Sequence, residues 1–146
     1  MSGVRERRFD SGWACGLAPF NPESVAIQAG RVMISELRRH TQDRISFSFE
    51  TTLSGRGYLR SIEDWQREGY VVKFLFLKLN SPEEAVARVE ARVKQGGHDI
   101  PEPVIRRRYD KGLHNFHHYY SEAVDVWALY DGSGRQPKLV DWGNNA

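Results

Sequence analysis

The stretch YVVKFLFLKLNSPEE, Tyr70–Glu84, reads as a strand followed directly by the start of a helix. Its first part, Tyr70 to Leu79, is nearly continuous in apolar residues, which is typical of a strand covered on both faces in a parallel sheet. Ser81 can act as an N-cap, with Pro82 in the first helical position and Glu84 three residues after the cap. This stretch therefore predicts the strand-to-helix connection of an α/β protein.

The rest of the chain alternates between short apolar strands and longer segments with helical periodicity. We expect helices over 22–39, 53–68, 82–95 and 104–122, and strands over 45–49, 70–79, 124–130 and 138–142. Because strands and helices follow one another in this order, the chain is predicted to be an α/β protein with a mainly parallel sheet, in a single domain over residues 1–146.

Composition excludes several classes of protein. A length of 146 residues with 40% apolar and 27% charged residues suits one globular domain. No apolar run approaches the roughly 20 residues that cross a bilayer, and the N-terminus lacks the apolar core of a secretory signal, so a cytoplasmic location is expected. Cys15 is the single cysteine, which rules out an internal disulfide and a cysteine-based zinc site. The net charge of +2 is too small to indicate a nucleic-acid partner by itself.

Polar side chains follow the expected strands where they end. Glu50, Thr51 and Thr52 come directly after the strand over 45–49. Similar groups follow the other strands, namely Asn80, Ser81, Asp131 and Ser133. In parallel sheets ligands bind outside these carboxyl ends, so Glu50 and the threonines can contact the hydroxyls of a substrate. Alternatively, Thr52 or Ser54 caps the next helix and Glu50 is solvated.

Five arginines surround a Gly-Gly-His loop. Arg88 and Arg92 are four residues apart on one expected helix and share a face. Arg106, Arg107 and Arg108 lie on the next helix. Guanidinium groups on two helices joined by a loop can close over a phosphate, although three consecutive arginines more often form a solvated basic face. At most one or two of them can face a single ligand, since successive residues point about 100° apart.

Histidines and aromatic residues are concentrated in HNFHHYY, residues 114–120. His114, His117 and His118 have i, i+3 and i, i+4 spacing, which is compatible with metal binding. No cysteine or carboxylate supports them, so we expect no metal site. Phe116, Tyr119 and Tyr120 are expected to be core or helix-packing residues.

Three motifs together resemble the zeta-toxin-like group of P-loop kinases: FETTLSG, then GGHDIPEPVIRRRY, then ALYDGSG. The similarity covers about residues 16–140 and includes GLAPFNPE near the start. It implies a three-layer P-loop NTPase-like fold and an ATP-dependent phosphotransferase that uses magnesium. Zeta-type toxins phosphorylate the sugar of a UDP-linked aminosugar, so a small-molecule acceptor and an antitoxin partner are implied.

The resemblance also implies roles for individual residues. Glu50, Thr51, Thr52 and His98 would contact the acceptor. Arg92 and Arg108 would bind the transferring phosphate. Asp131 and Ser133 would lie near the nucleotide base, where Gly132 replaces the asparagine that is common in the group.

The chain departs from this family at its N-terminus. It contains no G-x-x-x-x-G-K-[ST] motif, the loop whose amides and lysine hold the phosphates. The family's acidic residue aligns with Ser11, beside Asp10, and residues 1–15 do not read as the expected strand. We therefore expect a chain that is truncated or starts late, lacks the first central strand and the P-loop, and has weak or absent kinase activity.

Other interpretations remain open from the sequence. A divergent loop could replace the P-loop. The chain could also be a non-catalytic remnant that binds an antitoxin-like protein or a nucleotide sugar. Nucleic-acid binding through Arg106–Arg108 has less support, since the basic cluster is short.

Overall fold

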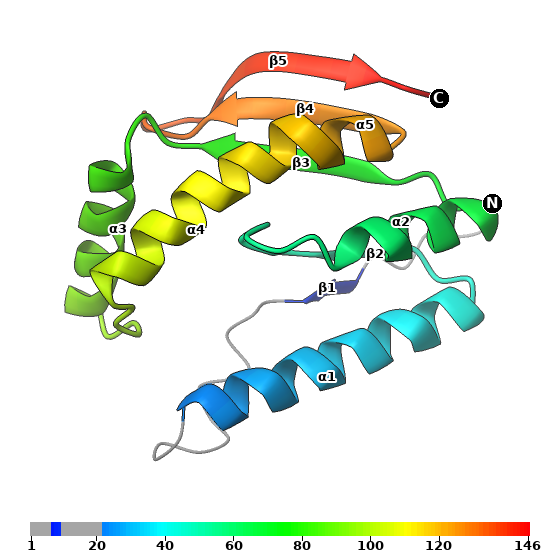
Figure 1. Cartoon of the computed structure of the whole chain (residues 1–146), viewed down its shortest axis with the longest axis horizontal. Helices are drawn as coiled ribbons and strands as arrows, with labels where there is room; N and C mark the ends of the chain where they lie inside the picture. The colour runs from blue at the N-terminus through cyan, green and yellow to red at the C-terminus, as the bar shows by residue number, and fades with distance from the viewer. Residues whose placement is uncertain (1–6, 10–21) are drawn as a thin grey trace. The chain divides into compact units, whose positions relative to one another are not determined.

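The computed structural model describes residues 7–9 and 22–146, with side chains from residue 30 onward. The chain is mixed α/β and consists of two compact units, residues 1–51 and 52–146. Figure 1 shows the order of the helices and strands along the chain. The sequence-based expectations for Ser11, Asp10 and Cys15 lie outside the described residues.

The first unit contains β1 (Arg7–Phe9), α1 (Pro22–Gln42) and β2 (Phe47–Phe49). The two strands pair in parallel, with Arg7 opposite Phe47. On α1, Leu37 and His40 are buried, and the His40 ring stacks on Phe47 with 6.1 Å between ring centroids. The helix and second strand of this unit were predicted from sequence.

The strand β1 corrects the expectation that residues 1–15 contain no strand. It is only three residues long, and two of these are arginines, so it lacks the apolar pattern that marks a strand in a sequence. Its strand character comes from pairing with β2, which is a tertiary interaction.

The second unit contains four helices, one π-helix segment and three strands in the described chain. They are α2 (Tyr58–Arg67), β3 (Lys73–Lys78), α3 (Pro82–Lys94), α4 (Glu102–Asn115), the π-helix η2 (Phe116–Tyr120), α5 (Ser121–Ala123), β4 (Val126–Asp131) and β5 (Lys138–Asn144). The helix predicted over 104–122 is therefore α4 continued through η2 and α5. The helix predicted from residue 53 begins at Tyr58 instead.

The strands form two separate sheets, which corrects the prediction of a single, mainly parallel sheet. In the second unit β3 pairs with β4 in parallel, whereas β4 pairs with β5 antiparallel. The antiparallel pair has a simple cause. Only a short turn joins Asp131 to Lys138, and a parallel pairing needs a much longer crossover.

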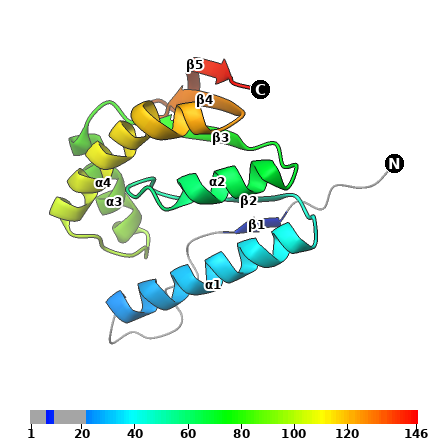
Figure 2. The ribbon, with the colours of Figure 1, turned by 45° about the vertical axis from the view of Figure 1, so that its right-hand side comes forward.

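One face of β3 packs against α4 and η2, which lie side by side with the sheet in Figures 1 and 2. Phe76 stacks on Phe116 with 4.8 Å between ring centroids, and Phe74 stacks on Tyr120 at 5.9 Å. Both Phe116 and Tyr120 are buried, as predicted. The prediction that β3 is covered on both faces was wrong, since Leu75 on the opposite face is 73% exposed.

In the residues that the structure describes, every helix is too short or too polar to span a lipid bilayer.

Candidate functional site at the loop before helix α2

The loop after Thr51 has an unusual backbone. Leu53 has φ = 55°, in the left-handed region that residues with a Cβ rarely adopt, and its side chain is 2% exposed. This conformation holds Thr52 and Ser54 with their hydroxyl oxygens 3.0 Å apart. Backbone strain of this kind costs roughly 1–3 kcal/mol and persists only where the surroundings impose it.

Two side chains from α4 and η2 hold the loop in place. The Asn115 side-chain amide donates a 2.8 Å hydrogen bond to the carbonyl oxygen of Leu53, and this contact is buried. The Tyr120 hydroxyl donates a 2.9 Å hydrogen bond to the carbonyl oxygen of Gly55. Burial raises the pKa of Tyr120, so the hydroxyl stays protonated and remains a donor. The loop conformation is therefore determined by residues about 60 positions later in the chain.

The loop also lies directly against α4 at Gly112. A Cβ on Gly112 would lie 2.8 Å from the carbonyl oxygen of Thr52, so any other residue would force the two apart. Arg108 precedes Gly112 by four residues, which is about 6 Å along the helix axis and about 40° around it. The structure therefore brings Thr52 and Arg108, both predicted from sequence, to the same side of α4.

Thr52 and Ser54 do not cap the following helix. The N-cap position of α2 is Gly57, and no side chain makes a cap hydrogen bond there. Of the two roles considered for Thr52, capping is thus excluded. Thr52 is exposed and its hydroxyl points to its neighbour on the loop instead.

Glu50 and Thr51 belong to the first unit, directly after β2. Both side chains are exposed. They follow the carboxyl end of that strand, as the sequence predicted.

The five arginines divide into paired and unpaired groups. Arg106 contacts Glu83 at 2.6 Å and Glu102 at 2.8 Å. The hydrogen bond with Arg106 lowers the pKa of Glu83, and the pKa of Arg106 is raised in turn. Arg88 donates to Glu84 and to the carbonyl oxygen of Gly132. These two guanidinium groups are therefore engaged within the protein.

The other three arginines are Arg92, Arg107 and Arg108. Within the described chain none of their side chains makes a hydrogen bond or an ion pair. The family resemblance assigns phosphate binding to Arg92 and Arg108. Both belong to this group, so no carboxylate of the described chain forms an ion pair with them.

The Gly-Gly-His loop folds back on Arg92. The backbone N–H groups of Gln95 and Gly97 both donate to the Arg92 carbonyl oxygen. A Cβ on Gly97 would lie 2.6 Å from Cγ of Arg92, so this close approach requires glycine. His98 follows directly and is exposed. His98 therefore follows a glycine that lies directly against Arg92 at the end of α3.

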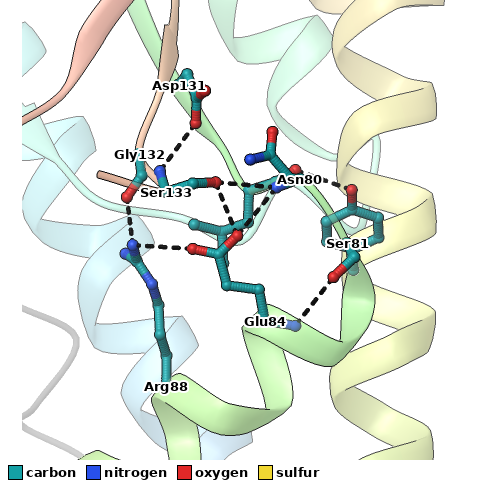
Figure 3. Close-up of polar contacts among 9 residues, drawn as sticks. Asn80, Ser81, Glu84, Arg88, Asp131, Gly132 and Ser133 are labelled. Carbon is teal, nitrogen blue, oxygen red and sulfur yellow. Dashed lines mark hydrogen bonds and ion pairs between the residues drawn. The ribbon is translucent and has the colours of Figure 1, made fainter.

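Asp131 and Ser133 lie in a polar cluster centred on Glu84 (Figure 3). The Ser133 hydroxyl donates to a Glu84 carboxylate oxygen at 2.7 Å, and the Asn80 backbone N–H contacts both groups at 3.2 Å. The Ser133 backbone N–H donates to Asp131 at 2.9 Å. The turn after β4 is thereby attached to the start of α3, so the convergence predicted for these strand ends is confirmed.

This cluster lowers the pKa of both carboxyl groups. The Ser133 hydroxyl is the main cause for Glu84, and the Ser133 backbone N–H is the main cause for Asp131. Ser81 caps α3 by accepting from the Glu84 backbone N–H at 3.2 Å, as predicted. The side chains of Asp131 and Ser133 are thus engaged in contacts within the protein.

The histidine segment does not form a metal site in the described residues, where no three histidine, cysteine or carboxylate groups gather around a point. His114 and His118 instead stack with 4.1 Å between ring centroids.

Sequence reasoning missed Gly112 and Asn115 because their roles depend on a distant loop. The signal in the sequence is weak: a glycine and an amide, three apart, on the apolar side of a helix.

Comparison with known proteins gives one relative. No family model and no solved structure matches the chain. A Haemophilus influenzae protein named "Uncharacterized protein" is 34% identical over 96 residues, which cover 66% of this chain and 69% of that protein. This chain belongs to the same family as that protein.

Proposed function

We propose that the chain, as a member of the family it shares with the Haemophilus influenzae protein, forms the acceptor-binding part of a small-molecule phosphotransferase of the zeta-toxin-like group. The proposal includes the three-layer P-loop NTPase-like arrangement that the resemblance implies. Its acceptor is a phosphate-bearing molecule with free hydroxyls, for which a nucleotide sugar is the model.

The observation that carries this proposal is the contact between the Thr52 loop and α4. It gives a hydroxyl pair on a loop that a buried amide holds, on the same side of α4 as Arg108, whose guanidinium group makes no ion pair in the described chain. Hydroxyl groups exchange hydrogen bonds with a sugar, and guanidinium groups bind phosphate oxygens in pairs. A fixed loop lowers the entropy lost on binding, because the groups are already in position.

Roles follow for one arginine on each of the helices α3 and α4. Arg108 would hold a phosphate of the acceptor or the transferring phosphoryl group. Arg92, with His98 beside it, would add a second positive group from the end of α3. Phosphoryl transfer depends on such charge stabilisation and positioning.

ATP and magnesium are the cofactors that the resemblance implies, but the chain has no Walker A motif to cradle a triphosphate. We therefore expect weak nucleotide binding and little transfer by this chain alone.

A second candidate function is a binding module without catalysis, directed at a nucleotide sugar or an antitoxin-like protein. The polar cluster at the β4–β5 turn favours it. Asp131 and Ser133, expected near the nucleotide base, are engaged with Glu84 and with each other. That cluster would have to open for these side chains to contact a base.

The proposal is tested by calorimetric titration of the purified chain. One titration uses UDP-N-acetylglucosamine, and the others use ATP with and without magnesium. We expect the nucleotide sugar to bind and ATP to bind no tighter than about 1 mM. Transfer of phosphate from ATP to the sugar distinguishes the enzyme from the binding module. Absence of nucleotide-sugar binding would refute the phosphotransferase proposal and would leave the binding module only an antitoxin-like protein as its partner.

A further inference from the structure

The outer face of α4 and η2 carries a line of positive or protonatable side chains. Arg107, Lys111, His114 and His118 follow one another at intervals of four, three and four residues. At about 100° per residue these side chains fall within roughly 60° of one another and extend about 16 Å along the helix. All four are exposed. We refer to these four residues as the α4 stripe.

Among the side chains that the structure describes, none forms an ion pair with the α4 stripe. Neither Arg107 nor Lys111 makes a hydrogen bond or an ion pair in the described chain, whereas Arg106 on the same helix contacts two carboxylates. The nearest acidic residues in sequence, Asp110 and Glu122, form no ion pair with the stripe among the described contacts. The stripe therefore offers uncompensated charge to a polyanion.

Aromatic surfaces accompany these charges. The rings of His114 and His118 are stacked with 4.1 Å between centroids, and the edge of Tyr119 meets His114 at 6.0 Å. The guanidinium carbon of Arg56 lies 5.0 Å from the centroid of the Tyr119 ring, and its NH1 group donates to the Tyr119 hydroxyl at 3.3 Å. One end of the stripe thus combines stacked rings with a further cation.

We propose that the α4 stripe binds single-stranded nucleic acid. Arg107 and Lys111 contact backbone phosphates, while the exposed His114–His118 pair provides ring faces for unstacked bases. Cations along a line together with exposed aromatic faces are the features of sequence-tolerant single-strand sites. Bases of a duplex are already stacked on each other, so the exposed rings favour a single strand.

This proposal differs from nucleic-acid binding through Arg106–Arg108. Arg106 is occupied by Glu83 and Glu102, and Arg108 lies about 100° around the helix from Arg107, toward the Thr52 loop. The line of charge therefore runs along the helix and is not formed by three consecutive residues. It is independent of the proposed phosphotransferase function.

Fluorescence anisotropy with a labelled oligouridylate of about twelve nucleotides tests the proposal across about 50 to 200 mM salt. We expect binding whose affinity falls with salt. Arg107→Ala combined with Lys111→Ala should weaken it about tenfold or more and reduce the logarithmic salt slope by about 0.7 for each cation removed. Arg135→Ala combined with Lys138→Ala, an equal loss of charge from the β4–β5 region, should change the affinity little.

A second variant tests the stacking part. His118→Ala removes the outer ring of the stacked pair, and we expect about a fivefold loss of affinity or more. Thermal unfolding of each variant checks that the fold is retained. Equal effects of the two double variants, or no binding by the natural chain, would overturn the proposal.

Competition identifies the class of partner. Polyglutamate and unlabelled RNA are compared as competitors at equal total charge. If polyglutamate displaces the labelled oligonucleotide equally well, the site is one for acidic polypeptides and the proposal is contradicted. Arg108→Ala should leave oligonucleotide binding intact while weakening nucleotide-sugar binding, so the outcomes for the two proposed sites are separable.

Discussion

The side-chain amide of Asn115 donates a buried hydrogen bond of 2.8 Å to the carbonyl oxygen of Leu53, the residue whose backbone has φ = 55°. Asn115, on α4, thus holds in place a loop residue that lies 62 positions earlier in the chain. The contact helps to explain how an unfavourable backbone conformation persists, since a buried amide donates directly to the carbonyl group of the strained residue.

Removing this donor should destabilise the second unit. We expect Asn115→Ala and Asn115→Asp to lower the free energy of unfolding by about 1–3 kcal/mol, because both remove the buried hydrogen bond that the Asn115 amide donates to the Leu53 carbonyl group. Gln95→Ala, at an exposed position after α3, serves as the control and should change stability little. Urea unfolding followed by circular dichroism measures the difference, and an unchanged midpoint for both Asn115 variants would show that the hydrogen bond contributes nothing.

Gly112→Ala should also destabilise the protein, although alanine favours helix. A methyl group at Gly112 would be placed 2.8 Å from the Thr52 carbonyl oxygen, and overpacking of this kind costs about 1–3 kcal/mol. Gly30→Ala on α1 is the matched control. No heavy atom lies within 4 Å of its Cβ position, so we expect a gain of about 0.5–1 kcal/mol there. Thermal unfolding of the two variants should shift in opposite directions; a gain for both would mean that the loop is not held against α4.

Acid should weaken the cluster around Glu84. The pKa values of Glu84 and Asp131 are lowered from their ordinary values of 4.5 and 3.8, so the fold favours the ionised forms. The ionised carboxylates therefore stabilise the folded protein at pH values above these ordinary pKa values. This stabilisation is lost as the pH falls through the lower pKa values of the folded protein.

Ser133→Ala tests the origin of this pH dependence. It removes the hydroxyl that donates to Glu84 but keeps the backbone N–H that donates to Asp131. The variant should therefore lose less stability than the natural protein between about pH 6 and pH 3. Ser35→Ala, at an exposed position of α1, should leave the pH profile parallel to that of the natural chain. Parallel profiles for both variants would assign the effect to other carboxylates.

Local features were predictable from the sequence. The Ser81 cap and the start of α3 were identified because a cap needs only residues within one turn. The positions of Asn80 and Ser133 at the carboxyl ends of two strands were also predicted, and these ends lie at the same edge because β3 and β4 run in parallel.

Features that depend on distant residues were not predictable. The roles of Gly112 and Asn115 exist only because the Thr52 loop lies against α4. The exposure of Leu75 could not be predicted either. An apolar run shows that both faces of a strand can be buried, but it does not show which elements cover them.

In the proposed site Arg108, on the same side of α4 as the Thr52 loop, binds a phosphate of the acceptor, and its neighbour Arg107 supplies the control. Calorimetric titration of UDP-N-acetylglucosamine into the natural chain, Arg108→Ala and Arg107→Ala compares equal losses of charge at adjacent positions. We predict that Arg108→Ala weakens binding about tenfold or more, as expected for a lost charge-assisted hydrogen bond, whereas Arg107→Ala keeps it within about twofold. An equal loss in both variants, or no measurable binding by the natural chain, would show that Arg108 does not hold the acceptor phosphate.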